Sequence, residues 1–497
     1  MERYAGQDPD NRPAVEGVRR TDRPGTGAAP GDARATQGEG DDQGVFGAEH
    51  RVLTIGLAAS VTVVAFLWLG VTTVMPAIAK DLDGLDLYGW AFTGFMLANM
   101  LAAATVGQWA DRSGPLRPFL LVLVLFAAGC AVAAAAPNWA VFLIGRSAQG
   151  FGVGGVLTLV YLTVGLRYPD RLRARVLALV ASCWTVPALA GPVLLGVLAD
   201  LFGWRAVFLL FVPLVIAAAV PTVPGLRGPG TGGDTDRRRL LATVLLAAGI
   251  GLLLAGLDSG RPALTAVLVA VGAAIAVPAL HTLMPSGFLT GRRGLPTTVL
   301  ARGLVSAGYY GSEAFFPLAM TTAFGFSTVG SGFALAVGAI TWVVGAWGQA
   351  KVDARAGDRG RRQRTLAGFV LLTAGLAVIA WSLAAHPGPG AGAAVIAWGV
   401  GGLGMGLVYP SVTTLALSLT ADERKGATSG DLQLSETLSV AVVTGVSGAM
   451  VAHGESAGWQ DTAAVALVFT LTALAALAGV LAATRTLPAR RADAAVP

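Results

Sequence analysis

Residues 139–163 read WAVFLIGRSAQGFGVGGVLTLVYLT, an apolar run with a single charged residue, Arg146. A helix needs about 20 such residues to cross the ~30 Å hydrocarbon core of a bilayer. A core helix of a soluble protein would show a polar face about every 3.6 residues, and this run does not. Residues 139–163 are therefore predicted to form a membrane-spanning helix.

The glycines at 150, 152 and 154 of this run recur at 402, 404 and 406, and a tyrosine follows each set, Tyr161 and Tyr409. Glycine at short spacing in one membrane helix is explained by close helix packing. Packing alone does not explain why both sets fall at matching places. We predict two duplicated halves, an architecture of secondary transporters with the substrate path at the interface of the halves.

The composition of the whole chain is typical of a membrane protein. Of 497 residues, 54% are hydrophobic and 13% are charged, and the mean hydropathy is +0.66. Soluble chains carry roughly 25% charged residues. The apolar blocks predict an all-α polytopic protein with fourteen spans, at 52–79, 88–110, 116–136, 139–163, 176–200, 204–222, 240–257, 262–283, 298–321, 328–350, 366–385, 391–418, 432–452 and 462–484.

The spans and the polar stretches divide the chain into five parts. Residues 1–50 hold few large apolar side chains and are predicted to be a disordered cytoplasmic tail. No secretory signal precedes the first span, which is expected to act as an uncleaved insertion signal. The other parts are an N-terminal six-helix half (51–224), a linker with an inserted transmembrane hairpin (225–297), a C-terminal six-helix half (298–485) and a cytoplasmic tail (486–497).

The basic residues predict the orientation. If the N-terminus lies inside, the cytoplasmic loops carry most of the arginines, and the outer loops hold only Lys80, Arg205 and Arg261. This is the distribution of the positive-inside rule. Scarce lysine with abundant alanine and glycine favours a GC-rich bacterial genome. We therefore predict a bacterial inner-membrane protein with both termini in the cytoplasm.

Several classes of protein are not supported. The two cysteines, Cys130 and Cys183, lie in apolar blocks and indicate neither a disulfide framework nor a metal site. There is no HExxH, no CxxC pair and no P-loop, so we expect no metal, no cofactor, no ATP-driven transport and no enzyme activity. Arginines in short loops face anionic lipid, which argues against nucleic-acid binding. The expected partners of this monomer are a lipophilic small molecule, protons and membrane lipid.

The loop between the second and third spans reads Gly107-Gln-Trp-Ala-Asp111-Arg112-Ser-Gly114-Pro-Leu-Arg117. It resembles the G-x-x-x-D-R-x-G-x-[RK] loop of the major facilitator superfamily, with the Asp-Arg pair and both glycines in register. Small residues allow a tight turn, and a carboxylate there can lie against the positive end of a neighbouring helix. We expect Asp111 to act as a conformational latch. The alternative is an ordinary basic loop.

The fourth span carries Arg146-Ser-Ala-Gln149-Gly150, which resembles the R-x-x-Q-G motif of the same superfamily. The resemblance implies a role for Arg146 in proton coupling. Arginine within a span is costly, so it is expected to face a cavity or a partner. The alternatives are that Arg146 reaches out of the membrane or ties helices together.

The fifth span reads Pro187-Ala-Leu-Ala-Gly191-Pro192-Val-Leu-Leu-Gly196, similar to the G-P-x-x-G antiporter motif. Proline kinks a helix and glycine lets its neighbour approach. The segment 203–208 also resembles the W-R-x-x-F of the fourteen-span drug antiporters. Together these motifs imply a major-facilitator-type fold and a drug:proton antiporter over residues 52–485. The alternative for the fifth span is a kinked packing helix.

The first span departs from that branch. Where the branch usually carries Asp, in L-D-x-T-x-V-N-x-A-L-P, this chain has Leu67, followed by Trp68. The proton carrier is therefore expected elsewhere, and Trp68 is expected to line the substrate cavity.

Glu313 is the best candidate for that carrier. Loss of hydration disfavours the charged form of a carboxyl in an apolar run, so it can gain and lose a proton near neutral pH. The alternative is a structural carboxyl. Asp431 and Glu436 are secondary candidates, although acids are also favoured near a helix N-terminus. The expected substrate cavity comprises Tyr309, Tyr310, Phe315, Phe316, Trp68 and Gln149.

The predicted function is proton-coupled efflux of lipophilic small molecules or drugs across the plasma membrane by alternating access. Their depths permit Arg146 and Glu313, from opposite halves, to line one central cavity; if they communicate across it, the cation would help Glu313 to release its proton. A second reading is a fourteen-span exporter of a lipid or secondary metabolite. A third, of a different class, is a non-transporting scaffold or sensor, against which the duplicated halves and Glu313 argue.

Overall fold

The computed structural model describes residues 44–486 apart from 49, 230, 231, 233–235, 357–359, 386–389, 422, 423, 458 and 460. Both predicted tails, 1–50 and 486–497, lie almost wholly outside the described residues. The unit Val45–Pro497 is compact. We describe this unit alone.

The described residues form helices and no strand, which confirms the predicted all-α fold. Besides two short 3-10 helices, η1 (Leu85–Leu87) and η2 (Val223–Leu226), the helices are α1 (Arg51–Asp81), α2 (Trp90–Ser113), α3 (Leu116–Ala134), α4 (Trp139–Arg167), α5 (Asp170–Ser182), α6 (Thr185–Phe202), α7 (Trp204–Thr222), α8 (Arg237–Leu257), α9 (Pro262–Leu283), α10 (Leu295–Thr322), α11 (Thr328–Ala356), α12 (Arg361–Ala385), α13 (Gly390–Ser418), α14 (Lys425–Ser456) and α15 (Asp461–Ala483).

Thirteen segments among the described residues are long and apolar enough to cross a membrane. Helix α10 is not one of them, although its 28 residues give it a sufficient length. It carries the charged residues Arg302 and Glu313, and most of its side chains are buried against other helices rather than exposed to lipid. With α10 included, the segments agree with the fourteen predicted spans.

The fifth span, predicted as one helix over 176–200, is two helices that meet at Cys183 and Trp184. Proline has no N–H to donate to the carbonyl four residues earlier, so Pro187 leaves the Cys183 carbonyl without its helical partner. Together α5 and α6 still form one candidate span, Arg171–Phe202.

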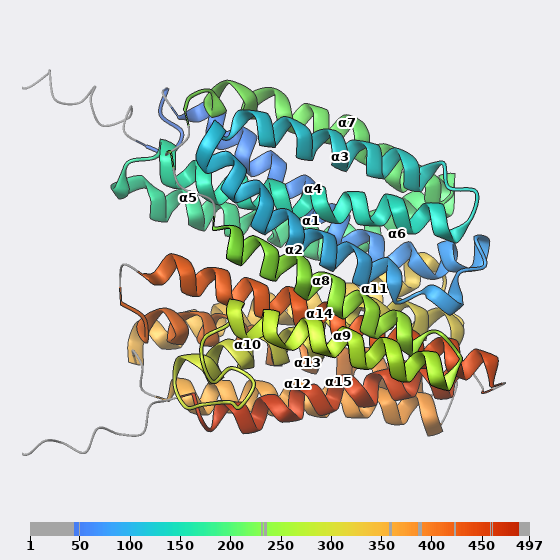
Figure 1. The fold of residues 1–497 in the computed structure, drawn as a ribbon. Coiled ribbons are helices and arrows are strands. Elements are labelled where there is room, and N and C mark those ends of the chain that lie inside the picture. The colour runs from blue at the N-terminus through green and yellow to red at the C-terminus, as the bar shows by residue number, and fades with distance from the viewer. Residues whose placement is uncertain are drawn as a thin grey trace, which may run out of the picture. The chain divides into compact units, whose positions relative to one another are not determined.

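The helices lie in two groups, α1–α7 and α10–α15, with α8 and α9 running alongside the seam between the groups (Figure 1). Loops predicted to share one side of the membrane do meet: the Gly294 N–H donates to the Arg485 carbonyl at 3.2 Å, and Gly232 N–H to the Asp111 carbonyl at 3.0 Å. We call the end of the bundle at which these loops lie the basic end, and the other end of the bundle the opposite end.

The repeated glycines make equivalent contacts in the two groups. A Cβ atom on Gly150 would overlap the Phe95 carbonyl of α2, and one on Gly402 would overlap the Gly338 carbonyl of α11. The fourth helix of each group therefore packs on the second and third helices in the same way, which requires residues without side chains. The other equivalent contacts are Gly154 on Asn99 and Gly406 on Trp342, and Gly152 on Phe126 and Gly404 on Gly368.

Helix α8 covers the seam between α2 and α14. Its side chains Leu246 and Ile250 form one apolar cluster with Met100 of α2 and Leu438 of α14. At the opposite end, Asp258 after α8 accepts a hydrogen bond from Trp90 Nε1 of α2. Burial raises the pKa of Asp258, and this hydrogen bond works against the rise. The inserted hairpin is thus attached to both groups.

Candidate substrate and proton site

The two groups touch directly in the half of the bundle near the opposite end. Thr93 of α2 donates its hydroxyl hydrogen to the Ala441 carbonyl of α14 at 3.1 Å, and its oxygen lies 3.2 Å from Thr444 Oγ1. The Tyr88 hydroxyl donates to the Ala314 carbonyl of α10 at 3.2 Å. Main-chain and hydroxyl contacts this close leave no passage at these points. In this conformation the bundle is closed toward the opposite end on the α2–α14 side.

The proline and glycine motif of α6 closes the other side. A Cβ atom on Gly332 of α11 would lie 2.7 Å from the Pro192 carbonyl oxygen, and one on Gly196 would lie 3.3 Å from Val329 Cα. Gly191 faces Gly70 of α1: a Cβ atom placed on Gly70 would lie 3.2 Å from the Gly191 carbonyl oxygen. The motif therefore lies where α6 meets α1 and the second group. Pro187 lies in the first turn of α6, directly after the break between α5 and α6.

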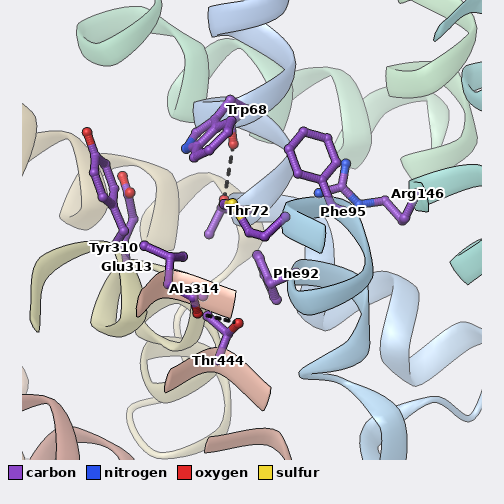
Figure 2. Close-up of a pocket in the computed structure, with 11 residues that line it drawn as sticks. Trp68, Thr72, Phe92, Phe95, Arg146, Tyr310, Glu313, Ala314 and Thr444 are labelled. Atoms are coloured by element: carbon purple, nitrogen blue, oxygen red, sulfur yellow. Dashed lines mark hydrogen bonds between the residues drawn. The ribbon is translucent and has the colours of Figure 1, made fainter. Parts of the chain in front are cut away.

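A small cavity lies between the groups beside these contacts, and Thr444 and Ala314 form part of its wall (Figure 2). Its volume is about 20 Å³, room for about one water molecule. Pockets that bind drug-sized ligands have volumes of about 300–1,000 Å³, so a substrate enters only after side chains or whole groups move. The lining residues come from both groups: Trp68, Thr72, Phe92, Phe95, Met96 and Arg146 from the first, and Tyr310, Glu313, Ala314, Val440 and Thr444 from the second.

Glu313 supplies the only carboxylate of this cavity and is 8% exposed. Among the described residues, its carboxylate has neither a hydrogen bond nor an ion pair. A charged carboxylate left without partners in such surroundings is expensive. The group therefore favours either a proton or a cationic ligand beside it.

Arg146 lies at the other side of the cavity, behind the Phe95 ring (Figure 2). Its Nε donates to the Ala91 carbonyl at 3.3 Å, and a terminal nitrogen donates to Gln149 Oε1 at 2.8 Å. The guanidinium carbon lies 4.5 Å from the Phe95 ring centroid, a cation–π contact. All these partners belong to the first group. Arg146 and Glu313 thus share one cavity but do not touch.

The predicted aromatic residues separate into two sets. Trp68 and Tyr310 line the cavity from opposite groups, with ring centroids 6.3 Å apart. The other three do not line it: Tyr309 and Phe316 stack on Trp398, and Phe315 packs on Tyr88 and Phe92. Gln149 is fully buried and holds Arg146. The sequence reasoning missed Phe92, Phe95 and Met96, because their membership depends on how α2 faces α10.

A second buried charged cluster lies toward the basic end. The Arg302 Nε of α10 donates to Glu436 Oε2 of α14 at 2.8 Å, and the Tyr409 hydroxyl of α13 donates to the same oxygen at 3.1 Å. Arg302 also donates to Thr413 Oγ1 at 2.7 Å. Arg302 was overlooked in the sequence, although a second arginine within an apolar span was a usable signal. Asp431, the other secondary candidate, forms an ion pair with Arg239 of α8 at 3.7 Å.

The loop motif after α2 lies at the basic end. Gly114 ends α2 with φ +82°, a conformation that favours glycine. A Cβ atom there would also overlap the Gly228 carbonyl of the linker to the hairpin. Asp111 follows one turn after Gly107, which faces Thr158 of α4. The exposed residues of the motif are Trp109, Arg112, Ser113 and Arg117.

Two packed groups of six spans each, with a cavity where they meet, define the fold of a secondary transporter. Residues 57–444 match the family model of the Major Facilitator Superfamily. The chain belongs to this superfamily, which confirms the resemblance predicted from its motifs.

The curated relatives of this chain include multidrug efflux transporters. A probable multidrug-efflux transporter of Mycobacterium tuberculosis is 28% identical over 86% of this chain and 93% of that protein. The multidrug resistance protein B homolog of the same species is 30% identical over 73% of this chain and 71% of that protein. The multidrug export protein EmrB of Escherichia coli is 26% identical over 82% of each chain.

Solved structures share the fold. A POT family transporter in complex with 5-aminolevulinic acid superimposes with a TM-score of 0.65 at 14% identity, over 90% of this chain and 99% of that one. The POT family transporter PepTSo gives a TM-score of 0.63 at 15% identity, over 87% and 97%. At such identities the likeness concerns the fold alone.

Proposed function

We propose that this protein is an antiporter that exchanges protons for lipophilic small molecules, aromatic cations in particular, and exports them from a bacterial cell. The observation that carries the proposal is Glu313, an unpartnered carboxylate among aromatic rings at the meeting point of the two groups. The names of the multidrug efflux relatives support export of drug-like compounds. The basic end is the cytoplasmic end in this proposal, in accordance with the positive-inside rule.

Glu313 carries out the exchange by holding one of two ligands at a time. A proton neutralises the carboxylate through a covalent O–H bond, and a cationic substrate neutralises it through charge attraction. The rings of Trp68 and Tyr310 favour a cation through cation–π contact, worth about 0.5–2 kcal/mol. Because both ligands remove the same unfavourable charge, binding of one releases the other. That competition is the coupling.

Alternating access converts this competition into export. The proposal has the groups separate first at the basic end, where substrate enters, and then at the opposite end, where a proton displaces it. Exchange of one proton for one monovalent cation moves no net charge, so the pH difference alone drives the export of a cation. For a neutral substrate, the membrane potential adds ~2.3 kcal/mol per proton and per 100 mV. The cavity of about 20 Å³ corresponds to a closed stage of this cycle.

Ethidium, a planar aromatic cation, tests the proposal in proteoliposomes that hold a pH-sensitive dye. Ethidium moving down its own gradient should drive protons the opposite way, and a neutral phenanthridine of similar size should move few protons. Ethidium movement without proton movement would reject the antiporter. Equal proton movement with the neutral compound would reject the preference for cations and favour the broader reading, export of a lipid or secondary metabolite.

A further inference from the structure

We propose that the Arg302–Glu436 pair, with Tyr409, is a second proton station, through which the proton of Glu313 leaves toward the basic end. The inference rests on the proposed function and adds a route to it. It concerns a buried cluster that the exchange at Glu313 does not itself require.

If the cluster only held helices together, its burial would be an expensive way to do so. Arg302 and Glu436 are 6% and 7% exposed, and both lie inside membrane-spanning helices. Removing two charges from water costs several kcal/mol each in such surroundings, and apolar residues of the same size often hold helices together equally well. The guanidinium carbon lies 3.3 Å from the Tyr409 ring centroid, and Thr413 holds a second nitrogen. Arg302 therefore keeps partners if Glu436 takes up a proton.

The cluster and Glu313 lie on one face of α10. Positions 302, 306 and 313 are four and seven residues apart, spacings that place side chains on the same side of a helix. Eleven residues at 1.5 Å each separate Arg302 from Glu313 by about 16 Å along the axis. Ser306, between them, is fully buried, and its hydroxyl has no hydrogen-bond partner among the described residues.

Tyr310 lies between the two charged sites. Its ring centroid is 6.0 Å from that of Trp342, which is 5.7 Å from the ring centroid of Tyr409 in the cluster. It lines the central cavity beside Glu313 (Figure 2). The polar groups along α10 thus form a series from the cavity to the ion pair.

The first group of helices also approaches the ion pair. Tyr161 of α4 is 54% exposed and lies near enough to Glu436 and Arg302 for their charges to act on its phenol. The groups that face Glu436 are therefore Arg302 and Tyr310 of α10, Tyr409 of α13 and Tyr161 of α4. The proposed route has water of the basic end approach the cluster beside the exposed side chain of Tyr161.

The proton transfer has two steps. Glu313 gives its proton to a chain of water molecules that passes Tyr310 and Ser306, and the last of these waters passes a proton to the Glu436 carboxylate. Arg302 then loses its ion pair but keeps its bond to Thr413. Glu436 next gives its proton to water at the basic end, and the ion pair forms again. One proton has moved from Glu313 to bulk water.

The test compares two neutralised ion pairs in proteoliposomes. Arg302→Gln/Glu436→Gln removes both charges of the cluster and keeps polar side chains of similar size, so no lone charge is left buried. Arg205→Gln/Asp81→Asn does the same to an exposed ion pair at the opposite end, whose atoms lie 2.8 Å apart. Three properties are measured for each: ethidium affinity, ethidium counterflow and ethidium export driven by a pH gradient.

The Arg302→Gln/Glu436→Gln protein should keep its affinity within about twofold and keep counterflow, while export driven by the gradient falls at least tenfold. The Arg205→Gln/Asp81→Asn control should retain all three properties. Wild-type export by the cluster variant would overturn the proposal and leave the pair as a helix tie.

Two milder variants keep the test decisive if the cluster variant does not fold. Ser306→Ala and Tyr409→Phe should each slow gradient-driven export at least threefold without changing counterflow. Normal export by both would overturn the route. Glu313→Gln is measured in parallel to separate the two proposals. If Glu313→Gln is uncoupled while the other variants export normally, only the second proton station is contradicted. Normal coupling in Glu313→Gln contradicts the proposed function itself.

Discussion

At the scale of single residues, two buried carboxylates differ in their surroundings. Glu313 faces a small aromatic cavity without a partner, whereas Glu436 accepts hydrogen bonds from Arg302 and Tyr409. The sequence predicts the burial of Glu313, because an acid within an apolar run must lie inside the bundle. It cannot predict the Arg302–Glu436 pair, because 134 positions separate the two residues and only the packing of α10 on α14 joins them.

Arg146 provides a prediction at this scale. If its charge acts on Glu313 across the cavity, Arg146→Gln should shift the pH profile of export to higher pH, because Glu313 then keeps its proton more readily. Arg146→Lys keeps the charge and should keep the profile, although it loses the two-point contact with Ala91 and Gln149. The measurement is export rate against pH. Identical profiles for wild type and Arg146→Gln would leave Arg146 as a packing residue.

At the scale of helices, glycine decides how closely neighbours approach. The sequence predicted the repeated glycines of α4 and α13 as packing positions, and the structure brings them onto equivalent neighbours. It did not predict the break at Cys183, although Pro187 was noted, because a proline can either kink a membrane helix or interrupt it. The prediction of the fifth span was therefore correct as one membrane crossing and wrong as one continuous helix.

Helix α4 contains a matched pair of glycines for a stability test. A Cβ atom on Gly154 would overlap the Asn99 carbonyl, whereas one on Gly165 has nothing within 4 Å. Gly154→Ala should cost about 1–3 kcal/mol through overpacking. Gly165→Ala should be neutral or stabilising by about 0.5–1 kcal/mol, since alanine favours a helix. Thermal unfolding of the purified protein in detergent measures both, and equal melting temperatures for the two variants would contradict this packing.

At the scale of the whole molecule, the two groups meet where α2 packs on α14 and where α6 packs on α11. The repeated glycines alone predicted two duplicated halves, and the match to the superfamily agrees with this prediction. The closed state could not be predicted from the sequence, because the same sequence adopts every conformation of the transport cycle. Contacts such as Thr93 on Thr444 are specific to one of these conformations.

A disulfide across this contact tests whether the groups must separate. In a background without Cys130 and Cys183, Thr93→Cys/Thr444→Cys should form a disulfide, because the two hydroxyls lie 3.2 Å apart. Oxidation should then reduce transport at least tenfold, and a reductant should restore it.

The matched control joins two helices of the same group. Ser312 and Thr472 have hydroxyls 2.7 Å apart, within α10 and α15. A disulfide in Ser312→Cys/Thr472→Cys should leave transport unchanged. Full transport by the oxidised Thr93→Cys/Thr444→Cys protein would show that these contacts do not open.

The central claim is that Glu313 couples proton movement to substrate movement. The most direct measurement is ethidium transport by wild type and Glu313→Gln in proteoliposomes, with and without an imposed pH gradient. Glutamine has nearly the same shape but neither exchanges a proton nor attracts a cation, so the variant should bind ethidium more weakly and, at saturating ethidium, should still exchange ethidium for ethidium across the membrane. It should not concentrate ethidium at the expense of the gradient. Accumulation by Glu313→Gln at the wild-type level would contradict the claim.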